Sequence, residues 1–294
     1  MKGGIVPYAD FTSSALWRRT CDYQGSKLQE ASPWRACRGY RKARRAFDIM
    51  HLCHLGFIRD VIGSVLKDTL ESGELQRFVQ LPGGTWDECL HAWTRMAQRF
   101  AKDRKLDLYM KPLTAANCGL TQIAYPELTS RVKASKARVL LAFTCHFDMA
   151  LDQEGANSHA LLRQRMVWNL DSALSIFGTA SRPHAATSDV HLGCRRFTTF
   201  LLSYQKLALN ALQQQRLLFK LRPKLHYLQH LILDTQQTEL NAMAMSNFGD
   251  EDHMKVLKSV SHACHPGKVL TSWAKRYLIK KCLLLRRYEY RPQS

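Results

Sequence analysis

Two acidic segments of the 294-residue chain have the composition of metal-binding sites. Asp48 lies in the apolar run 47–51 (FDIMH), and burying a carboxylate costs free energy unless it gains a partner or a metal ion. Residues 250–253 (DEDH) open a predicted helix, where acids complement the helix dipole and could also bind Mg²⁺. Taken singly, neither segment requires a metal. Asp48 could instead cap a helix or pair with Arg44 or Arg45. Interaction with the helix dipole alone would explain the acids of 250–253.

A second group of candidates combines histidine and cysteine. The pattern His-x-Cys-His occurs at 51–54 and again at 262–265, while His226 and His230 share one face of a predicted helix. Zinc modules usually show tighter pairs of ligands, and a metalloprotease helix would carry a glutamate after its first histidine. The spacing therefore argues against zinc and favours ordinary core or surface histidines. The chain also lacks the G-x-S-x-G, P-loop and G-x-G-x-x-G patterns of common hydrolases, NTPases and dinucleotide enzymes.

Positive charge is concentrated at both ends of the sequence. The formal net charge is +19, of which residues 1–45 carry +7 and residues 268–294 another +7, which leaves +5 for the long middle. Clustered cations attract phosphate directly and by counterion release, so we expect a polyanionic partner, DNA above all. The predicted nucleic-acid-binding residues are Arg41, Lys42, Arg44, Arg45, Lys275, Arg276, Lys280, Lys281, Arg286 and Arg287.

The remaining composition predicts a nuclear or otherwise intracellular protein. No apolar stretch approaches the ~20 residues that span a bilayer, no export signal is evident, and we expect no membrane partner. The nine cysteines have no paired spacing, which favours reduced thiols.

Helical periodicity then gives the elements that must position these residues. A mainly α fold is expected, because apolar residues recur at three/four spacing and no stretch alternates cleanly with period two. Thr85 is a predicted N-cap and Pro223 sits where a helix tolerates proline. Residues 44–50 could form the edge of a buried strand, but their pattern alone does not decide it. The predicted helices cover 54–71, 85–102, a stretch from 130, 156–178, 187–220, a stretch from 223, 250–264 and 270–286.

Three blocks of the chain resemble a known family. Residues 47–51 followed by 56–66 (GFIRDVIGSVL) resemble the second-aspartate block of DDE transposases of the CACTA kind. Residues 223–231 (PKLHYLQHL) are similar to the block before that family's last acid, and 251–258 (EDHMKVLK) to the element containing it. The order of the blocks and the long helical stretch between them also match.

The resemblance implies an RNase H-like α/β core with a helical insertion, in which three acids hold two Mg²⁺ or Mn²⁺ ions for phosphodiester attack. By position, Asp48 would be the second acid and metal ligand, and Glu251 the third. The first should lie upstream on core strands, but Asp10, Asp22 and Glu30 stand among helix and strand breakers. The chain thus resembles a truncated or degenerate C-terminal part of such a transposase.

The sequence-based hypothesis is a transposase-derived DNA-binding protein that is not catalytically competent alone, unless the first acid is supplied elsewhere. Expected parts are an irregular basic segment 1–43, a helical transposase-like domain 44–267, and a basic helix and tail 268–294. A non-catalytic helical nucleic-acid-binding module and a protein-interaction scaffold stay open as alternatives, as does a homo-oligomer. The catalytic interpretation requires the Asp48 and Glu251 carboxylates to come close enough to share a metal.

Overall fold

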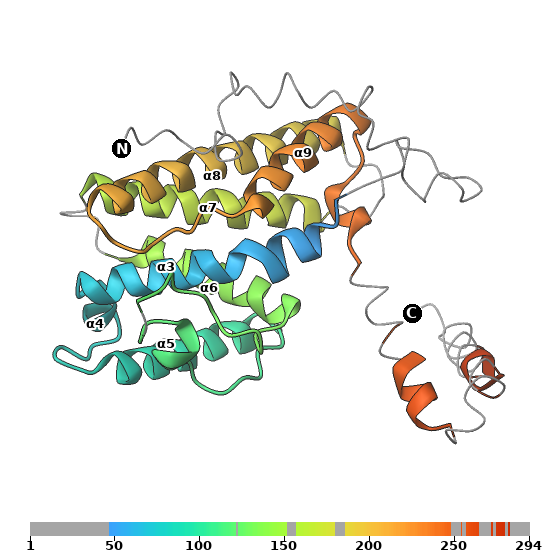
Figure 1. Cartoon of the computed structure of the whole chain (residues 1–294), viewed down its shortest axis with the longest axis horizontal. Coiled ribbons are helices and arrows are strands. Elements are labelled where there is room, and N and C mark those ends of the chain that lie inside the picture. Colours follow the sequence, from blue (N-terminus) through green and yellow to red (C-terminus); the bar gives the residue numbers. More distant parts are fainter. Residues whose placement is uncertain are drawn as a thin grey trace. The chain divides into compact units, whose positions relative to one another are not determined.

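A computed structural model of the protein describes residues 47–121, 123–151, 157–179, 186–247, 254, 257–264, 272, 275–279 and 282 (Figure 1). The chain divides into two compact units, Met1–Met245 and Ser246–Ser294. The elements of the first unit are η4 (Met50–Phe57), α3 (Ile58–Glu71), α4 (Glu74–Phe78), α5 (Trp86–Asp103), η5 (Ala116–Cys118), α6 (Ala134–Ala150), α7 (Ser158–Thr179), α8 (Thr187–Gln213), α9 (Pro223–Thr238) and η6 (Ala242–Met245).

The prediction of a mainly α protein is confirmed. The ranges that the structure describes contain no β-strand, and Ile49 in the undecided run 44–50 is already helical. A remnant RNase H-like sheet is therefore not found in these ranges. None of their helices is long and apolar enough to cross a membrane.

Local chemistry explains several helix ends. Thr85 accepts a hydrogen bond from the Glu88 backbone N–H while the Glu88 side chain accepts from Thr85, so a capping box starts α5. Pro223 occupies the first turn of α9, as predicted. In contrast, α8 ends at Gln213 rather than near 220, because Gln215 and Phe219 adopt positive φ angles of 57° and 54° that a helix cannot continue through.

Helix α3 is central to the first unit. In Figure 1 it runs between the stacked helices α7, α8 and α9 on one side and α5 on the other, and it contacts η4, α4 and α6. Its polar residues Asp60, Ser64 and Asp68 are buried together with its apolar ones. The helix is therefore enclosed on all sides rather than amphipathic at a surface, so its carboxylates need partners from other elements.

The longest helices pair with each other. A Cβ atom on Gly193 of α8 would lie 2.6 Å from the Phe177 ring of α7, and the rings of Phe177 and Phe197 stack with centroids 5.8 Å apart. Helix α9 covers α8, where Cys194 Sγ lies 3.8 Å from the Ile232 carbonyl oxygen. This layer fixes α9 and the residues it carries against η4.

In the second unit, residues 257–262 and 275–279 are helical. Val260 and Cys264 are buried, and the Arg276 guanidinium donates to the Ala263 carbonyl oxygen at 2.5 Å. That hydrogen bond ties the two helical stretches of this unit together.

Candidate functional site

The structure brings two of the three resembling blocks together. The Phe47 ring stacks on Tyr227 and on His230 of α9, with centroids 5.6 and 5.8 Å apart. Lys224 Nζ donates to the His51 carbonyl oxygen at 2.9 Å, across 173 residues of sequence. Residues 47–51 and the first turns of α9 thus form one surface, which is the candidate functional site.

Close approach of the two segments depends on a glycine. Gly56 interrupts η4 with non-helical angles (φ −97°, ψ −117°). A Cβ atom there would lie 2.9 Å from Lys224 Cδ and 3.1 Å from the His51 carbonyl oxygen. The predicted helix 54–71 therefore begins in wide π-type turns and becomes regular only at Ile58.

Asp48 is engaged by its own chain. Its Oδ1 accepts the Met50 backbone N–H at 2.9 Å, and its Oδ2 pairs with His51 Nδ1. The Asp48 side chain is 16% exposed, against 50% for His51. Of the interpretations left open by the sequence, a helix cap therefore describes this carboxylate, while Arg44 and Arg45 lie outside the described residues.

Two side chains that could take part in catalysis, Cys53 and His54, feel the charge of Asp48 and are held in their neutral forms. Burial raises the pKa of the Cys53 thiol far above its usual range, and the Asp48 charge raises it further. Burial lowers the pKa of His54 to about 4, and the charge of Arg138 acts in the same direction. At neutral pH Cys53 is a thiol and His54 an uncharged imidazole, so neither is prepared for nucleophilic catalysis.

On α9, the two predicted histidines touch. The Nε2 atoms of His226 and His230 lie 3.1 Å apart, and His226 Nδ1 lies 3.2 Å from Gln229 Oε1. Because an amide oxygen only accepts, the network assigns the proton of His226 to Nδ1, and His230 Nε2–H then donates to His226 Nε2. Burial lowers the pKa of both rings, to about 4 for His230. Both rings are therefore neutral at pH 7.

Most of the other predicted site residues fall outside the described part of the chain: Glu251 with its neighbours in 250–253, Arg41, Lys42, Arg44, Arg45, Lys280, Lys281, Arg286 and Arg287. The required approach of Glu251 to Asp48 consequently stays a prediction. Lys275 and Arg276 are described and exposed in the second unit.

The donor set for a metal is small in the described ranges. No group of three or more His, Cys, Asp or Glu residues there is placed to hold a metal ion. Asp48 contributes one carboxylate whose two oxygens already have protein partners, while Mg²⁺ sites use carboxylates together with substrate phosphate. Residues at this site fit a Mg²⁺ or Mn²⁺ ion only if further carboxylates, Glu251 among them, join Asp48. In the second unit, the Cys264 thiol lies 3.2 Å from the carbonyl oxygen of Val260, four residues earlier in the chain.

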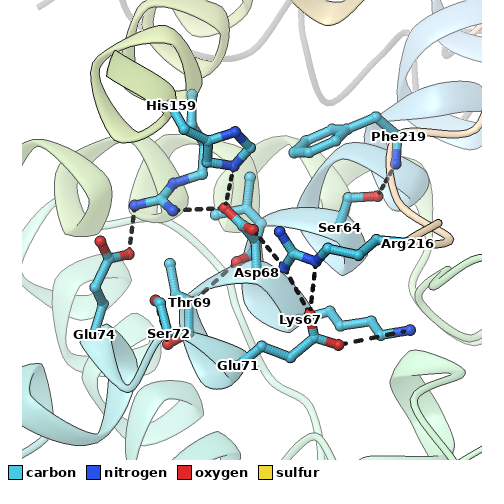
Figure 2. Close-up of polar contacts among 12 residues, drawn as sticks. Ser64, Lys67, Asp68, Thr69, Glu71, Ser72, Glu74, His159, Arg216 and Phe219 are labelled. Atoms are coloured by element: carbon cyan, nitrogen blue, oxygen red, sulfur yellow. Dashed lines mark hydrogen bonds and ion pairs between the residues drawn. The ribbon is translucent and has the colours of Figure 1, made fainter. Parts of the chain in front are cut away.

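A buried ionic network that the sequence did not predict lies along α3 (Figure 2). The Arg163 guanidinium is 1% exposed and donates to Asp68 at 2.7 Å, to Glu74 at 2.7 Å and to Asp148 at 2.9 Å. Such a buried cation is retained only where every N–H has an acceptor. Arg163 therefore joins α3, α4, α6 and α7.

Asp68 has two further partners besides Arg163. His159 Nε2 lies 2.9 Å from Asp68 Oδ2, and Arg216 donates at 2.8 Å to Asp68 Oδ1 and at 2.6 Å to Glu71. Although burial raises the pKa of Asp68, its hydrogen bonds with His159 and Arg163 and their charges lower it well below the usual range. Asp68 is therefore a permanent anion and not a proton acceptor, which gives the network a structural role.

A second network surrounds Asp60. Arg222 donates to Asp60 Oδ1 at 2.8 Å and also to Glu127, which lies 3.2 Å from Arg59. The other oxygen, Asp60 Oδ2, is buried with no hydrogen-bond partner among the described residues. Burial raises the pKa of Asp60 to about 7, against the opposing charge of Arg222. One signal in the sequence was available: Asp60, Ser64 and Asp68 recur every four residues on a helix otherwise rich in apolar side chains.

Comparison with known proteins gives no relative: no family model, no curated protein and no solved structure matches the chain.

Proposed function

We propose that the protein binds DNA and derives from a DDE transposase whose catalytic site is incomplete in this chain. The observation that carries the proposal is the contact between residues 47–51 and α9. Both segments belong to the resemblance, and the folded chain joins them through Lys224 and His51 and through Phe47 and Tyr227. A coincidental resemblance of separate blocks would not require the blocks to meet.

Charge supports DNA as the partner. The two buried networks contain six carboxylates and four arginines, so they add no net positive charge to the chain. The net charge of +19 is therefore carried by the other residues of the chain, where it acts on a polyanion instead of being cancelled internally. A DNA partner implies the nucleus, or another compartment that holds DNA.

Catalysis would require a metal site that includes Asp48. Bound Mg²⁺ or Mn²⁺ would activate the attacking oxygen and stabilise the leaving one. Asp48 would be one ligand and Glu251 another. In the described structure the Asp48 carboxylate caps Met50 and pairs with His51, a role that needs no metal.

The test is binding of the full chain to a fluorescent DNA duplex, followed by anisotropy at several salt concentrations. We expect the logarithm of the binding constant to fall linearly with the logarithm of salt concentration, with a slope of about −0.9 for each phosphate neutralised. Nicking assays with Mg²⁺ and with Mn²⁺ accompany it, and we expect no cleavage by the chain alone.

Two results would overturn the proposal. Absence of duplex binding even at low salt removes the DNA partner and favours a scaffold for an acidic protein. Metal-dependent cleavage that disappears in both Asp48→Asn and Glu251→Gln would show that the site is complete after all.

A further inference from the structure

A third concentration of positive charge lies within the first unit, far in sequence from the basic ends. Residues 95–111 contain six Lys or Arg and two Asp, a net charge of +4. Arg95, Arg99 and Lys102 are four and three residues apart on α5, so they share one face of the helix. All three are exposed, while Trp93, Ala97 and Ala101 of the same helix are fully buried.

The segment after α5 turns back along the helix. Gln98 Nε2 donates to the Met110 carbonyl oxygen at 2.8 Å, and the Leu113 backbone N–H donates to Thr94 Oγ1 at 3.0 Å. The loop runs antiparallel to α5, because Met110 meets Gln98 whereas the later residue Leu113 meets the earlier residue Thr94. This places the exposed Lys111 beside the helix rather than beyond its end.

The beginning of α6 is fastened to the same loop. Lys136 Nζ donates to the Tyr109 carbonyl oxygen, and the exposed Lys133 precedes α6 directly. Lys105 adds a further exposed cation just after α5. Cations from the helix, the loop and the start of α6 thus lie on connected pieces of backbone. We name Arg95, Arg99, Lys102, Lys105 and Lys111 the α5 basic surface.

These cations differ from the arginines of the buried networks. Among the described residues, none of the five members of the α5 basic surface forms an ion pair, in contrast to Arg163, whose guanidinium meets three carboxylates. Exposed, unpaired cations keep their full attraction for an external polyanion, and releasing counterions from that polyanion adds to binding.

We propose that the α5 basic surface binds the phosphate backbone of duplex DNA. The proposal rests on the DNA-binding function proposed above and assigns it to a surface. Single strands are bound by rows of exposed aromatic rings as well as by charge, but residues 95–111 contain only two aromatic side chains, Phe100 and Tyr109. The Arg104 guanidinium covers the Phe100 ring at 3.8 Å, which leaves Tyr109, 85% exposed, as a single stacking surface.

The experiment compares the full chain with the triple variant Arg95→Gln, Arg99→Gln, Lys102→Gln by duplex anisotropy between 50 and 200 mM salt. Loss of three phosphate contacts should reduce the salt slope by about 3, so that wild-type affinity falls about 40-fold more than that of the variant over this range. A matched control removes the same charge from exposed positions of α7 and α8: Arg165→Gln, Arg195→Gln, Lys206→Gln. The control should keep a slope within about 1 of the wild type, and melting followed by circular dichroism should show both variants folded.

Each outcome decides the assignment. If the wild type binds DNA and the α5 variant keeps its full salt slope, the surface assignment fails while the DNA-binding function stands. Equal losses in both variants would show a net-charge effect and also overturn the assignment. Tighter binding to a single strand of equal length would overturn the choice of duplex, and a wild type that binds no DNA overturns both proposals.

Discussion

Arg163 and Asp68 form a buried ion pair between residues 95 positions apart in sequence, with Nη1 2.7 Å from Oδ2. Arg163 is 1% exposed and Asp68 is 3% exposed. The pair links α7 to the central helix α3, and its geometry makes the stability of the first unit sensitive to one cation.

Replacing that cation should be among the most damaging single changes. Arg163→Met keeps much of the side-chain volume but leaves Asp68 and Asp148 buried without their shared partner. We expect a loss of about 3–5 kcal/mol in the free energy of unfolding, measured by urea denaturation. Arg165→Met, two residues along the same helix and exposed, should stay within about 0.5 kcal/mol of the wild type. A loss below about 1 kcal/mol in Arg163→Met would contradict a stabilising role of this network.

Asp60 should make the first unit less stable as pH rises. Its folded-state pKa of about 7 lies above the value of about 3.9 for an unfolded aspartate. The folded protein therefore holds the Asp60 proton more tightly, and the resulting stability is greatest at low pH and is lost as pH rises through 7. Asp148, whose pKa burial raises to about 6, acts with the same sign. The stability that Asp68 contributes has the opposite sign and is lost only at much lower pH.

The measurement is urea unfolding at pH 5 and pH 8. Between these values wild-type stability should fall by on the order of 2–3 kcal/mol more than that of Asp60→Asn, which cannot ionise. A carbon-13 NMR titration of the Asp60 carboxyl group supplies the direct check, and a midpoint below pH 5 would rule out this explanation.

Two helical glycines should respond to alanine in opposite directions. A Cβ atom on Gly63 of α3 would meet backbone atoms of Pro126 and Glu127 at 3.0 Å, whereas one on Gly178 of α7 meets only Met243 Cε at 3.9 Å. Gly63→Ala should lower the free energy of unfolding by about 1–3 kcal/mol through overpacking. Gly178→Ala should raise it by up to about 1 kcal/mol, because alanine is the better helix former. Stabilisation by both substitutions would mean that the 126–127 backbone yields easily.

Asp48 offers a test of whether its oxygen as a helix cap, or its charge, stabilises the fold. Asparagine retains the oxygen that accepts the Met50 N–H, so Asp48→Asn should unfold within about 0.5 kcal/mol of the wild type, while Asp48→Ala should lose about 0.5–2 kcal/mol. Neither variant should alter the duplex affinity of the full chain. Equal destabilisation by asparagine and alanine would indicate instead that the charge facing His51 is what matters.

The sequence predicted those elements whose causes are local. Thr85, Glu88 and the apolar repeat between them and Asp103 lie within a few turns of each other, so the start and length of α5 could be read directly. The same holds for Pro223 at the start of α9. The placement of Asp48 as a cap was among the alternatives because the necessary backbone N–H is two residues away.

Features that depend on distant residues were not predictable in this way. The partners of Asp68 lie 91 to 148 residues further along the chain. The spacing of Asp60, Ser64 and Asp68 marks a polar row on α3 but does not identify the residues that pair with it. The break at Gly56 follows from the approach of Lys224, which the linear pattern of 54–71 does not contain. The common face of Arg95, Arg99 and Lys102 follows from their spacing on the predicted helix 85–102. The return of the loop that carries Lys111 along that helix depends on contacts that the sequence does not show.

The enclosure of α3 has a consequence for how the protein is made. Synthesis proceeds from the N-terminus, so α3 leaves the ribosome long before Arg163, Arg216 and Arg222 exist to receive its carboxylates. Until the chain reaches residue 222, burying Asp60 and Asp68 would cost free energy because their arginine partners are missing. Contacts between residues this far apart in sequence also form slowly. The first unit thus completes its folding only after most of its length has been translated. A product that ends before residue 222 would expose α3, which is both apolar and acidic, to chaperones and proteases.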